Sequence, residues 1–218
     1  MSSIMDRELQ ELKDKLLKMG ALVENQVERA VKSLVERDAE LATSVINSDD
    51  MVNRIEVDID EECIRILALR HPEAGDLRFV TTAMKIVTDL ERMGDLAVDI
   101  CERALELNEE PQLKPYIDLP RMALAAREML KEALDAFVNR DSQLARKVTQ
   151  SDDFVDDLNE QIFREIVTYM VADPHSISSA IRLTYVSKYI ERIADHATNI
   201  AEMVVYLVEG KIIRHMGV

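Results

Sequence analysis

The sequence predicts an all-α protein of two tandem antiparallel three-helix bundles, related by internal duplication. Three observations carry this prediction. The composition favours helices, because aromatic residues make up only 4%, Trp is absent, and Gly and Pro number five each. Apolar residues recur at spacings of three and four along extended stretches, which is the period of a helix face. One set of motifs also occurs twice in the chain.

The duplication is clearest around a short acidic motif. Residues 91–95 (Glu-Arg-Met-Gly-Asp) return as residues 191–195 (Glu-Arg-Ile-Ala-Asp), an offset of 100 positions. Upstream, the Ser-Asp-Asp of residues 48–50 returns at 151–153, an offset of 103. A repeat of about a hundred residues has the size of a small domain. We therefore predict two modules, residues 1–110 and 111–218.

The first module is expected to begin with two long helices. The first runs from about Ile4 to Arg37, and Asp38 is a suitable N-cap for the second because its carboxylate can accept a bond from a free amide. The second helix runs to about Arg70, and Ser48–Asp50 is a candidate kink. Its expected inward positions are Val45, Val52, Ile55, Ile59, Ile66 and Leu69.

Residues 71–75 (His-Pro-Glu-Ala-Gly) are expected to end the second helix, because proline does not continue a helix and glycine adopts turn geometry freely. A third helix is expected from about Asp76 to Asn108. The proline-bearing stretch 109–116 is the predicted boundary between the modules. The second module repeats the plan, with helices expected at about Pro120–Asn139, Asp141–Ala172 and Pro174–Lys211.

Charge and composition exclude several classes of protein. A formal net charge of −15 argues against a nucleic-acid partner, because phosphate contacts need basic surface. No apolar run reaches the roughly 20 residues that span a bilayer, and the first residues lack the features of a signal peptide. Cys63 and Cys101 form no CxxC pair and read as buried, reduced thiols. We expect a cytoplasmic protein.

Carboxylates on the third helix are the first candidate ligands for a metal ion. Glu91, Asp95 and Asp99 recur at i, i+4 and i+8, so they stack on one helix face. Like charges at this spacing destabilise a helix by a few tenths of a kcal/mol per pair, and a bound cation would remove that repulsion. The sixth helix carries the corresponding set, Glu191, Asp195 and Asn199.

The second and fifth helices supply an opposite wall for each set. The second helix offers Asp49, Asn53, Glu56 and Asp60, and the fifth offers Asp152, Asp156 and Asn159. Two facing rows of oxygen ligands suit divalent or trivalent ions, and we consider iron, manganese, magnesium and zinc. The alternative remains open that each acidic stripe is a solvated helix face, repeated because a structural element was duplicated.

Signatures of catalysis are absent from the sequence. A carboxylate-bridged di-iron bundle needs Glu-x-x-His pairs, and no His in this chain has a Glu three residues before it. Glycine-rich nucleotide loops and recognisable nucleophile motifs are also missing. His196 follows Asp195, but the helical period turns it about 100° away, so we expect an exposed or outer residue. We predict that the chain is not an enzyme.

Residues 89–95 (Asp-Leu-Glu-Arg-Met-Gly-Asp) and 189–195 (Tyr-Ile-Glu-Arg-Ile-Ala-Asp) resemble the acidic motifs of the PhoU family, accessory regulators of the bacterial phosphate-specific transport system. The resemblance covers nearly the whole chain. It implies that the metal motif falls on Glu91 and Asp95 and on Glu191 and Asp195. Because Asn199 stands where the first module has Asp99, it also implies a weaker second site.

The resemblance further implies a negative regulator of phosphate-starvation signalling. Such a protein would connect the ATPase subunit of the phosphate ABC transporter to a sensor histidine kinase, associate with the membrane through these partners, and form a homodimer. Two rival functions stay open at this point. One is a structural helical adaptor that binds partners without metal, and the other is a metalloenzyme that uses the acidic clusters.

Overall fold

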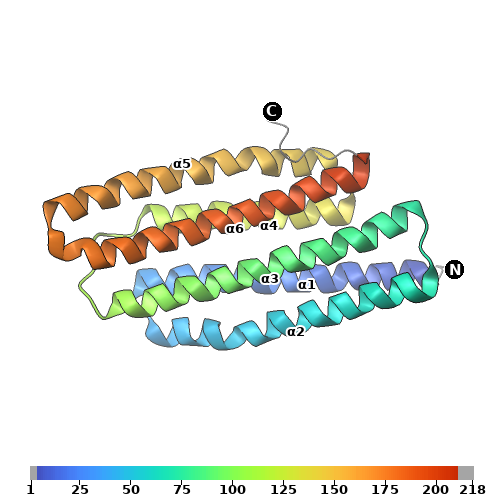
Figure 1. The fold of residues 1–218 in the computed structure, drawn as a ribbon, viewed down its shortest axis with the longest axis horizontal. Helices are drawn as coiled ribbons and strands as arrows, with labels where there is room; N and C mark the ends of the chain where they lie inside the picture. The colour runs from blue at the N-terminus through green and yellow to red at the C-terminus, as the bar shows by residue number, and fades with distance from the viewer. Residues whose placement is uncertain (1–3, 211–218) are drawn as a thin grey trace.

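A computed structural model describes residues 4–210 and confirms the all-α prediction (Figure 1). Strands are absent from this range. The elements in chain order are α1 (Ile4–Glu36), α2 (Ala39–Arg70), α3 (Ala74–Asn108), α4 (Asp118–Asn139), α5 (Ser142–Ala172), the short 3₁₀ helix η1 (Pro174–Ser176) and α6 (Ile177–Glu209). The expected end of the last helix, Lys211, lies outside the described residues.

The first two helices of each module are joined by the same tight connection. Asp38 caps α2 by accepting a hydrogen bond from the amide of Leu41 at 2.9 Å. Asp141 caps α5 in the same way, from the amides of Gln143 and Leu144 at 3.0 Å. The predicted N-cap at Asp38 is therefore confirmed, and the same local chemistry reverses the chain in both repeats.

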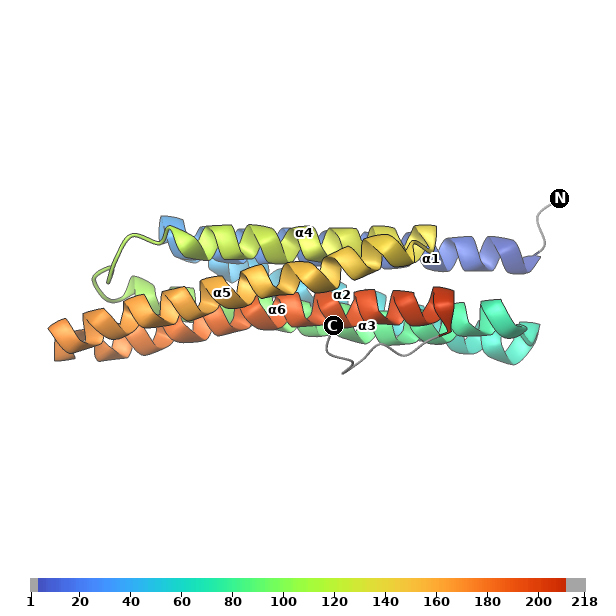
Figure 2. The ribbon, with the colours of Figure 1, turned by 90° about the horizontal axis from the view of Figure 1, so that it is seen from above.

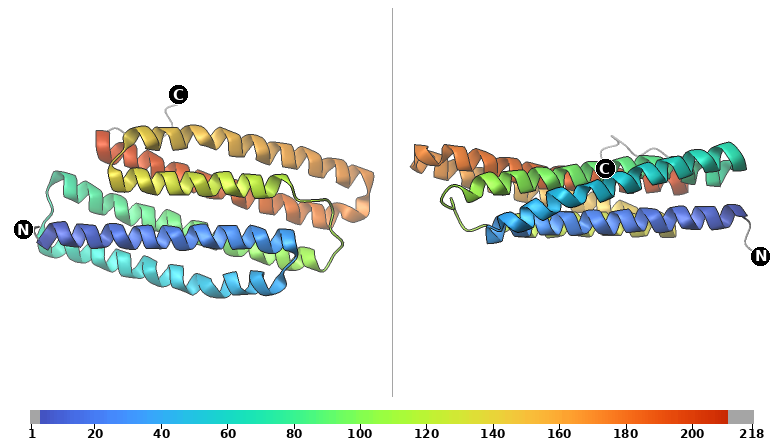
Figure 3. Two further views of the ribbon diagram at one scale, coloured as in Figure 1. Left: turned by 180° about the vertical axis from the view of Figure 1, so that it is seen from behind. Right: turned by 90° about the horizontal axis from the view of Figure 1, so that it is seen from below.

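The helices form two groups of three that meet along two lines of contact. Helices α1, α2 and α3 pack together, as do α4, α5 and α6, and the groups meet through α3 against α6 and α1 against α4. A half-turn about the viewing direction of Figure 1 carries α3 onto α6 and α2 onto α5. Seen from above, α1 and α4 lie on one side of the molecule and α3 and α6 on the other (Figure 2). The view from behind shows α1 beside α4 (Figure 3).

The buried apolar residues form one continuous core that runs through both groups of helices. Phe79 of α3 stacks on Phe137 of α4, with ring centroids 4.8 Å apart. Gly20 of α1 lies so close to Leu134 of α4 that a Cβ added to the glycine would lie 2.1 Å from Leu134 Cδ1. The sequence predicted two bundles, and the structure adds that their cores are fused.

Three details of α2 differ from, or add to, the sequence-based expectation. The candidate kink at Ser48–Asp50 does not interrupt the helix. Leu69, expected to face inward, is 61% exposed, because the buried face of α2 ends at Ile66. Cys63, like Cys101 of α3, is a buried free thiol, and burial raises the pKa of each thiol to about 12.

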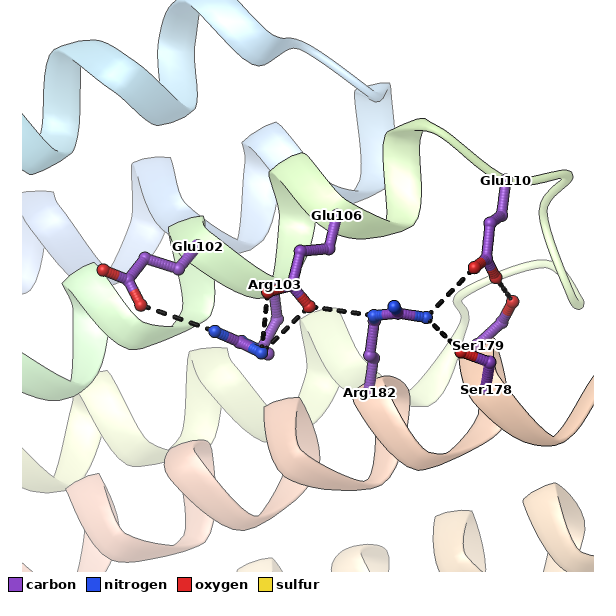
Figure 4. A network of polar contacts seen from close by, with 7 residues as sticks. All are labelled: Glu102, Arg103, Glu106, Glu110, Ser178, Ser179 and Arg182. Carbon is purple, nitrogen blue, oxygen red and sulfur yellow. Dashed lines mark hydrogen bonds and ion pairs between the residues drawn. The ribbon is translucent and has the colours of Figure 1, made fainter.

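A polar network fastens the end of α3 to the start of α6 (Figure 4). Arg182 of α6 donates to Glu106 Oε2 at 2.8 Å and to Glu110 Oε1 at 3.1 Å. The Ser179 hydroxyl also donates to Glu110. Arg37, at the end of α1, donates to the backbone carbonyls of Asn108 and Glu110 at 2.8 and 2.7 Å. The inter-module connection is therefore held at its start by charged groups from three helices.

Within residues 4–210, every helix is either too short or too polar to cross a bilayer.

Candidate metal centre

The first acidic cluster lies where α2 packs on α3. On α2, the Asn53 amide donates to Asp49 Oδ2 at 3.0 Å. Burial raises the pKa of Asp49, while hydrogen bonds from Gln26 and Asn53 lower it and the charge of Asp95 on α3 raises it further. The structure therefore brings the predicted residues Asp49, Asn53 and Asp95 into one neighbourhood.

Glu56 and Glu91 complete this cluster from the two helices. Burial raises the pKa of Glu91, and the charges of Asp95 and Glu56 add to the effect. Burial also raises the pKa of Glu56, with further increases from Asp60 and Asp95. Arg92 offsets part of this repulsion, since its Nε lies 3.4 Å from Glu91 and its Nη1 lies 3.2 Å from Asp95. The remaining repulsion is the kind that a bound cation relieves.

Asp99 lies at the edge of the first cluster, towards the second module. Burial raises the pKa of Asp99, and the neighbouring charges of Glu102 and Asp95 raise it further. Arg103 of α3 and Arg192 of α6 act in the opposite direction. The pKa of Asp99 therefore depends on a charge of the second module as well as on its own cluster. The spacing of residues along α3 did not predict this.

The second acidic cluster lies at the matching place between α5 and α6. Burial raises the pKa of Asp152 to about 6, and the charges of Asp156 and Asp195 contribute to this rise. Burial likewise raises the pKa of Asp195, with Glu191 next in effect. Lys188 forms an ion pair with Glu191 and neutralises part of the cluster. These four predicted residues are thus close enough to repel one another.

Two other predicted positions of the second module have different roles. Asn159, which matches Glu56 of the first module, accepts a hydrogen bond from the Ser187 hydroxyl at 2.9 Å. Its amide oxygen is therefore engaged within the helix pair. Asn199 stands one helical turn beyond Asp195 and supplies no charge, so the second cluster is poorer in carboxylates than the first.

The donor chemistry of both clusters fits a hard cation. Carboxylate and amide oxygens are ligands for magnesium, manganese and iron, whereas zinc sites usually include His or Cys. Asp152 Oδ1 is buried and accepts no hydrogen bond from the described residues. Among residues 4–210, however, no three His, Cys, Asp or Glu side chains converge on one point as a ready ligand set. Metal binding therefore requires the carboxylates to turn towards a shared position.

The sequence analysis did not predict the contacts of two residues near the clusters, Gln26 and Asp89. Gln26 of α1 reaches the first cluster, where its Nε2 donates to Asp49 Oδ1 at 3.2 Å. The available signal was a polar residue inside the apolar stripe of α1, between Val23 and Val27. Asp89 of α3 lies 2.8 Å from His196 of α6, so His196 is an inter-module contact and not an exposed residue.

Comparison with known proteins places both repeats in one family. The family model for the PhoU domain matches residues 16–104 and again residues 119–204. The chain is 46% identical to a phosphate-specific transport system accessory protein PhoU homolog of Aquifex aeolicus, over 97% of this chain and 96% of that protein. It is 38% identical to the accessory protein PhoU of Escherichia coli, over 96% of this chain and 87% of that protein.

Solved structures agree with these matches in both fold and sequence. The crystal structure of PhoU from Pseudomonas aeruginosa superposes with a TM-score of 0.90 at 44% identity, covering 94% of this chain and 99% of that one. The phosphate transport system regulatory protein PhoU from Streptococcus pneumoniae gives a TM-score of 0.89 at 35% identity, covering 95% and 98%. The chain belongs to the PhoU family.

Proposed function

We propose that this chain is an accessory protein of a bacterial phosphate-specific transport system and a negative regulator of the phosphate-starvation response. The relatives from Aquifex aeolicus and Escherichia coli are named as accessory proteins of that system, and the Streptococcus pneumoniae structure as its regulatory protein. The similarity extends over both repeats and nearly the full length of the chain. In this role the chain connects the transporter ATPase subunit to a sensor histidine kinase.

This regulator acts by binding and not by catalysis. Its net charge of −15 suits docking on basic protein surfaces. It works in the cytoplasm, reaches the membrane through its partners, and forms a homodimer. The dimer is testable by light scattering on the purified protein, where a monomer mass of 24.8 kDa at micromolar concentration would contradict it.

The observation that carries a metal-dependent mechanism is the pair of matched acidic clusters between α2 and α3 and between α5 and α6. Burial raises the pKa of Glu91 and Asp195, and repulsion from the neighbouring carboxylates raises it further. Iron, manganese or magnesium bound there would cancel the repulsion and fix the two helices of each pair relative to one another. A docking surface ordered in this way binds its partner at a lower entropic cost, because its helices are already in place.

Elemental analysis of protein purified without chelator tests the metal component. We compare the natural sequence with Glu91→Ala/Asp95→Ala and with Glu191→Ala/Asp195→Ala. Each double variant should lose metal from its own half and retain the other half's metal. Absence of metal from the natural sequence, even after reloading with iron, manganese and zinc, would contradict metal binding.

Partner binding tests the regulatory component. The purified transporter ATPase subunit and the kinase's cytoplasmic part are titrated against metal-loaded and metal-free protein. The proposal expects both partners to bind the loaded protein more tightly. In cells, deletion of the gene should switch on phosphate-starvation reporters in phosphate-rich medium, and a complementing copy should silence them. Reporters that stay silent in the deletion strain would contradict the negative role.

A metal-independent adaptor is the second candidate, and one observation favours it. Arg92 and Lys188 already form ion pairs with carboxylates of the first and second clusters. These cations relieve part of the repulsion without any metal. Equal partner affinity with and without metal would select this candidate.

A further inference from the structure

Gln26 is a buried polar residue in the apolar stripe of α1. Gln26 is only 4% exposed, and Val23 and Val27 beside it on α1 are fully buried. The amide Nε2 donates to Asp49 Oδ1 at 3.2 Å. The carbonyl Oε1 is buried and accepts no hydrogen bond from the described residues. A buried carbonyl oxygen without a donor is unfavourable, so it requires an explanation.

Gly94 of α3 lets this oxygen and Asp49 Oδ1 lie close to the helix backbone. A Cβ at position 94 would lie 3.1 Å from Asp49 Oδ1 and 3.3 Å from Gln26 Oε1. The two oxygens, from α2 and α1, therefore face the same point above α3. Glycine within a helix is unfavourable relative to alanine. The two oxygens thus approach α3 at a position where alanine would give the better helix but would crowd them.

The second repeat lacks both features. At an offset of 103, the residue that matches Gln26 is Met129, which is buried to a similar degree at 2% exposure. At an offset of 100, Ala194 stands where the first repeat has Gly94. Met129 has no amide to donate to Asp152, the counterpart of Asp49, and Asp152 Oδ1 remains without a donor. The two clusters are therefore built differently at their inner walls.

We propose that Gln26 and Asp49, whose oxygens converge above Gly94, form a cation subsite of the first cluster, in which the Gln26 carbonyl is a neutral oxygen ligand from α1. The proposal rests on the metal binding proposed above and makes it more specific. A mixed set of carboxylate and amide oxygens suits a hard ion such as Mn²⁺. The Gln26 amide group also orients Asp49, as outer groups do for ligands in metal sites. The two repeats then bind metal non-equivalently, with Mn²⁺ held more tightly in the first.

Mn²⁺ titration of the full chain tests this assignment. The parent protein carries Asp152→Asn/Asp195→Asn, which silences the second cluster, and is stripped of metal with chelator. Binding is followed by calorimetry and by the electron paramagnetic resonance signal of free Mn²⁺. Gln26→Met copies the residue of the second repeat and should weaken Mn²⁺ binding by about 10–100-fold. The matched control is Met129→Leu, a buried change in the second repeat, which should leave the Kd unchanged.

A second variant keeps the test decisive if Gln26→Met does not fold by circular dichroism. Gly94→Ala places a methyl group against the two oxygens and should push them apart, so it should also weaken Mn²⁺ binding at least tenfold. A Kd within threefold of the parent in the folded variants overturns the subsite while leaving metal binding at the acidic motif intact. If neither the parent protein nor the natural sequence binds Mn²⁺, iron or magnesium, the proposed metal function itself is overturned.

Discussion

His196 Nδ1 lies 2.8 Å from Asp89 Oδ1, and this contact joins α6 to α3 across the two repeats. Both side chains are less than a fifth exposed, at 19% and 18%. The duplication does not generate the pair, because Leu96 and Tyr189 stand at the matching positions. The interface between the modules is therefore symmetric in its backbone and asymmetric in its polar contacts.

Replacement of His196 by Leu, the residue found at position 96, should destabilise the protein. The change removes a largely buried hydrogen bond and leaves Asp89 without it, so we expect a loss of about 1–2 kcal/mol. The thermal midpoint should fall by roughly 2–8 °C for a chain of this size. Unfolding is followed by circular dichroism in chelator. The control is His175→Leu, which breaks an exposed His–Asp contact to Asp173 and should leave the thermal midpoint nearly unchanged. Equal losses in the two variants would contradict a special role for the inter-module pair.

The sequence predicts those parts of the fold that depend on local chemistry. The helices follow from the periodic spacing of apolar residues, and the N-cap at Asp38 follows from its place directly before the start of α2. The contacts between modules depend on side chains distant in sequence, such as Arg182 and Glu110, that would be solvated in either module alone. For this reason the acidic motif was visible in the sequence, and the pair of Asp89 with His196 was not.

Asp152 gives the metal-free protein a pH dependence with a defined sign. Its pKa rises from 3.8 to about 6 on folding, mainly through burial. The folded state therefore holds the proton more tightly, and stability is lost as the pH rises from about 4 through 6. Asp152→Asn removes the buried charge and should stabilise the protein at pH 8 by roughly 1–2 kcal/mol, discounted for partial exposure.

The pH series on Asp152→Asn is measured by chemical denaturation in chelator at pH 4, 6 and 8. Most of the gain in stability should disappear at pH 4, because the folded natural sequence holds the proton there and the unfolded side chain, with a pKa of 3.8, is already partly protonated. Asp153→Asn changes the exposed neighbour and serves as the control. A gain that is the same at all three pH values would mean that ionisation of Asp152 is not its cause.

Glu8 should have the opposite pH dependence. Hydrogen bonds from Arg70 and then Arg65 lower its pKa from 4.5 to about 2. The resulting stability is present above pH 4.5 and is lost as the pH falls towards 2. Glu8→Gln should lower the thermal midpoint at pH 7 and have little effect near pH 2. Glu11→Gln, in an exposed pair with Arg7, is the control with a small effect at either pH. A Glu8→Gln loss that persists unchanged at pH 2 would contradict this assignment.

Gly20 sets how closely α1 approaches α4, and its replacement tests whether the two modules share one rigid core. A Cβ at position 20 would lie 2.1 Å from Leu134 Cδ1, so Gly20→Ala forces Leu134 out of its place or separates the helices. Overpacking of this kind costs about 1–3 kcal/mol, which exceeds the gain in helix propensity of roughly 1 kcal/mol. Gly75→Ala is the matched control, because nothing lies within 4 Å of its added Cβ, and it should be neutral or stabilising.

Chemical denaturation measures the free energy of unfolding of Gly20→Ala, Leu134→Ala and the double variant Gly20→Ala/Leu134→Ala. A loss in the double variant equal to or larger than the sum of both single losses would mean that the two residues do not clash. A loss smaller than that sum shows that the tight contact between the modules is the origin of the effect.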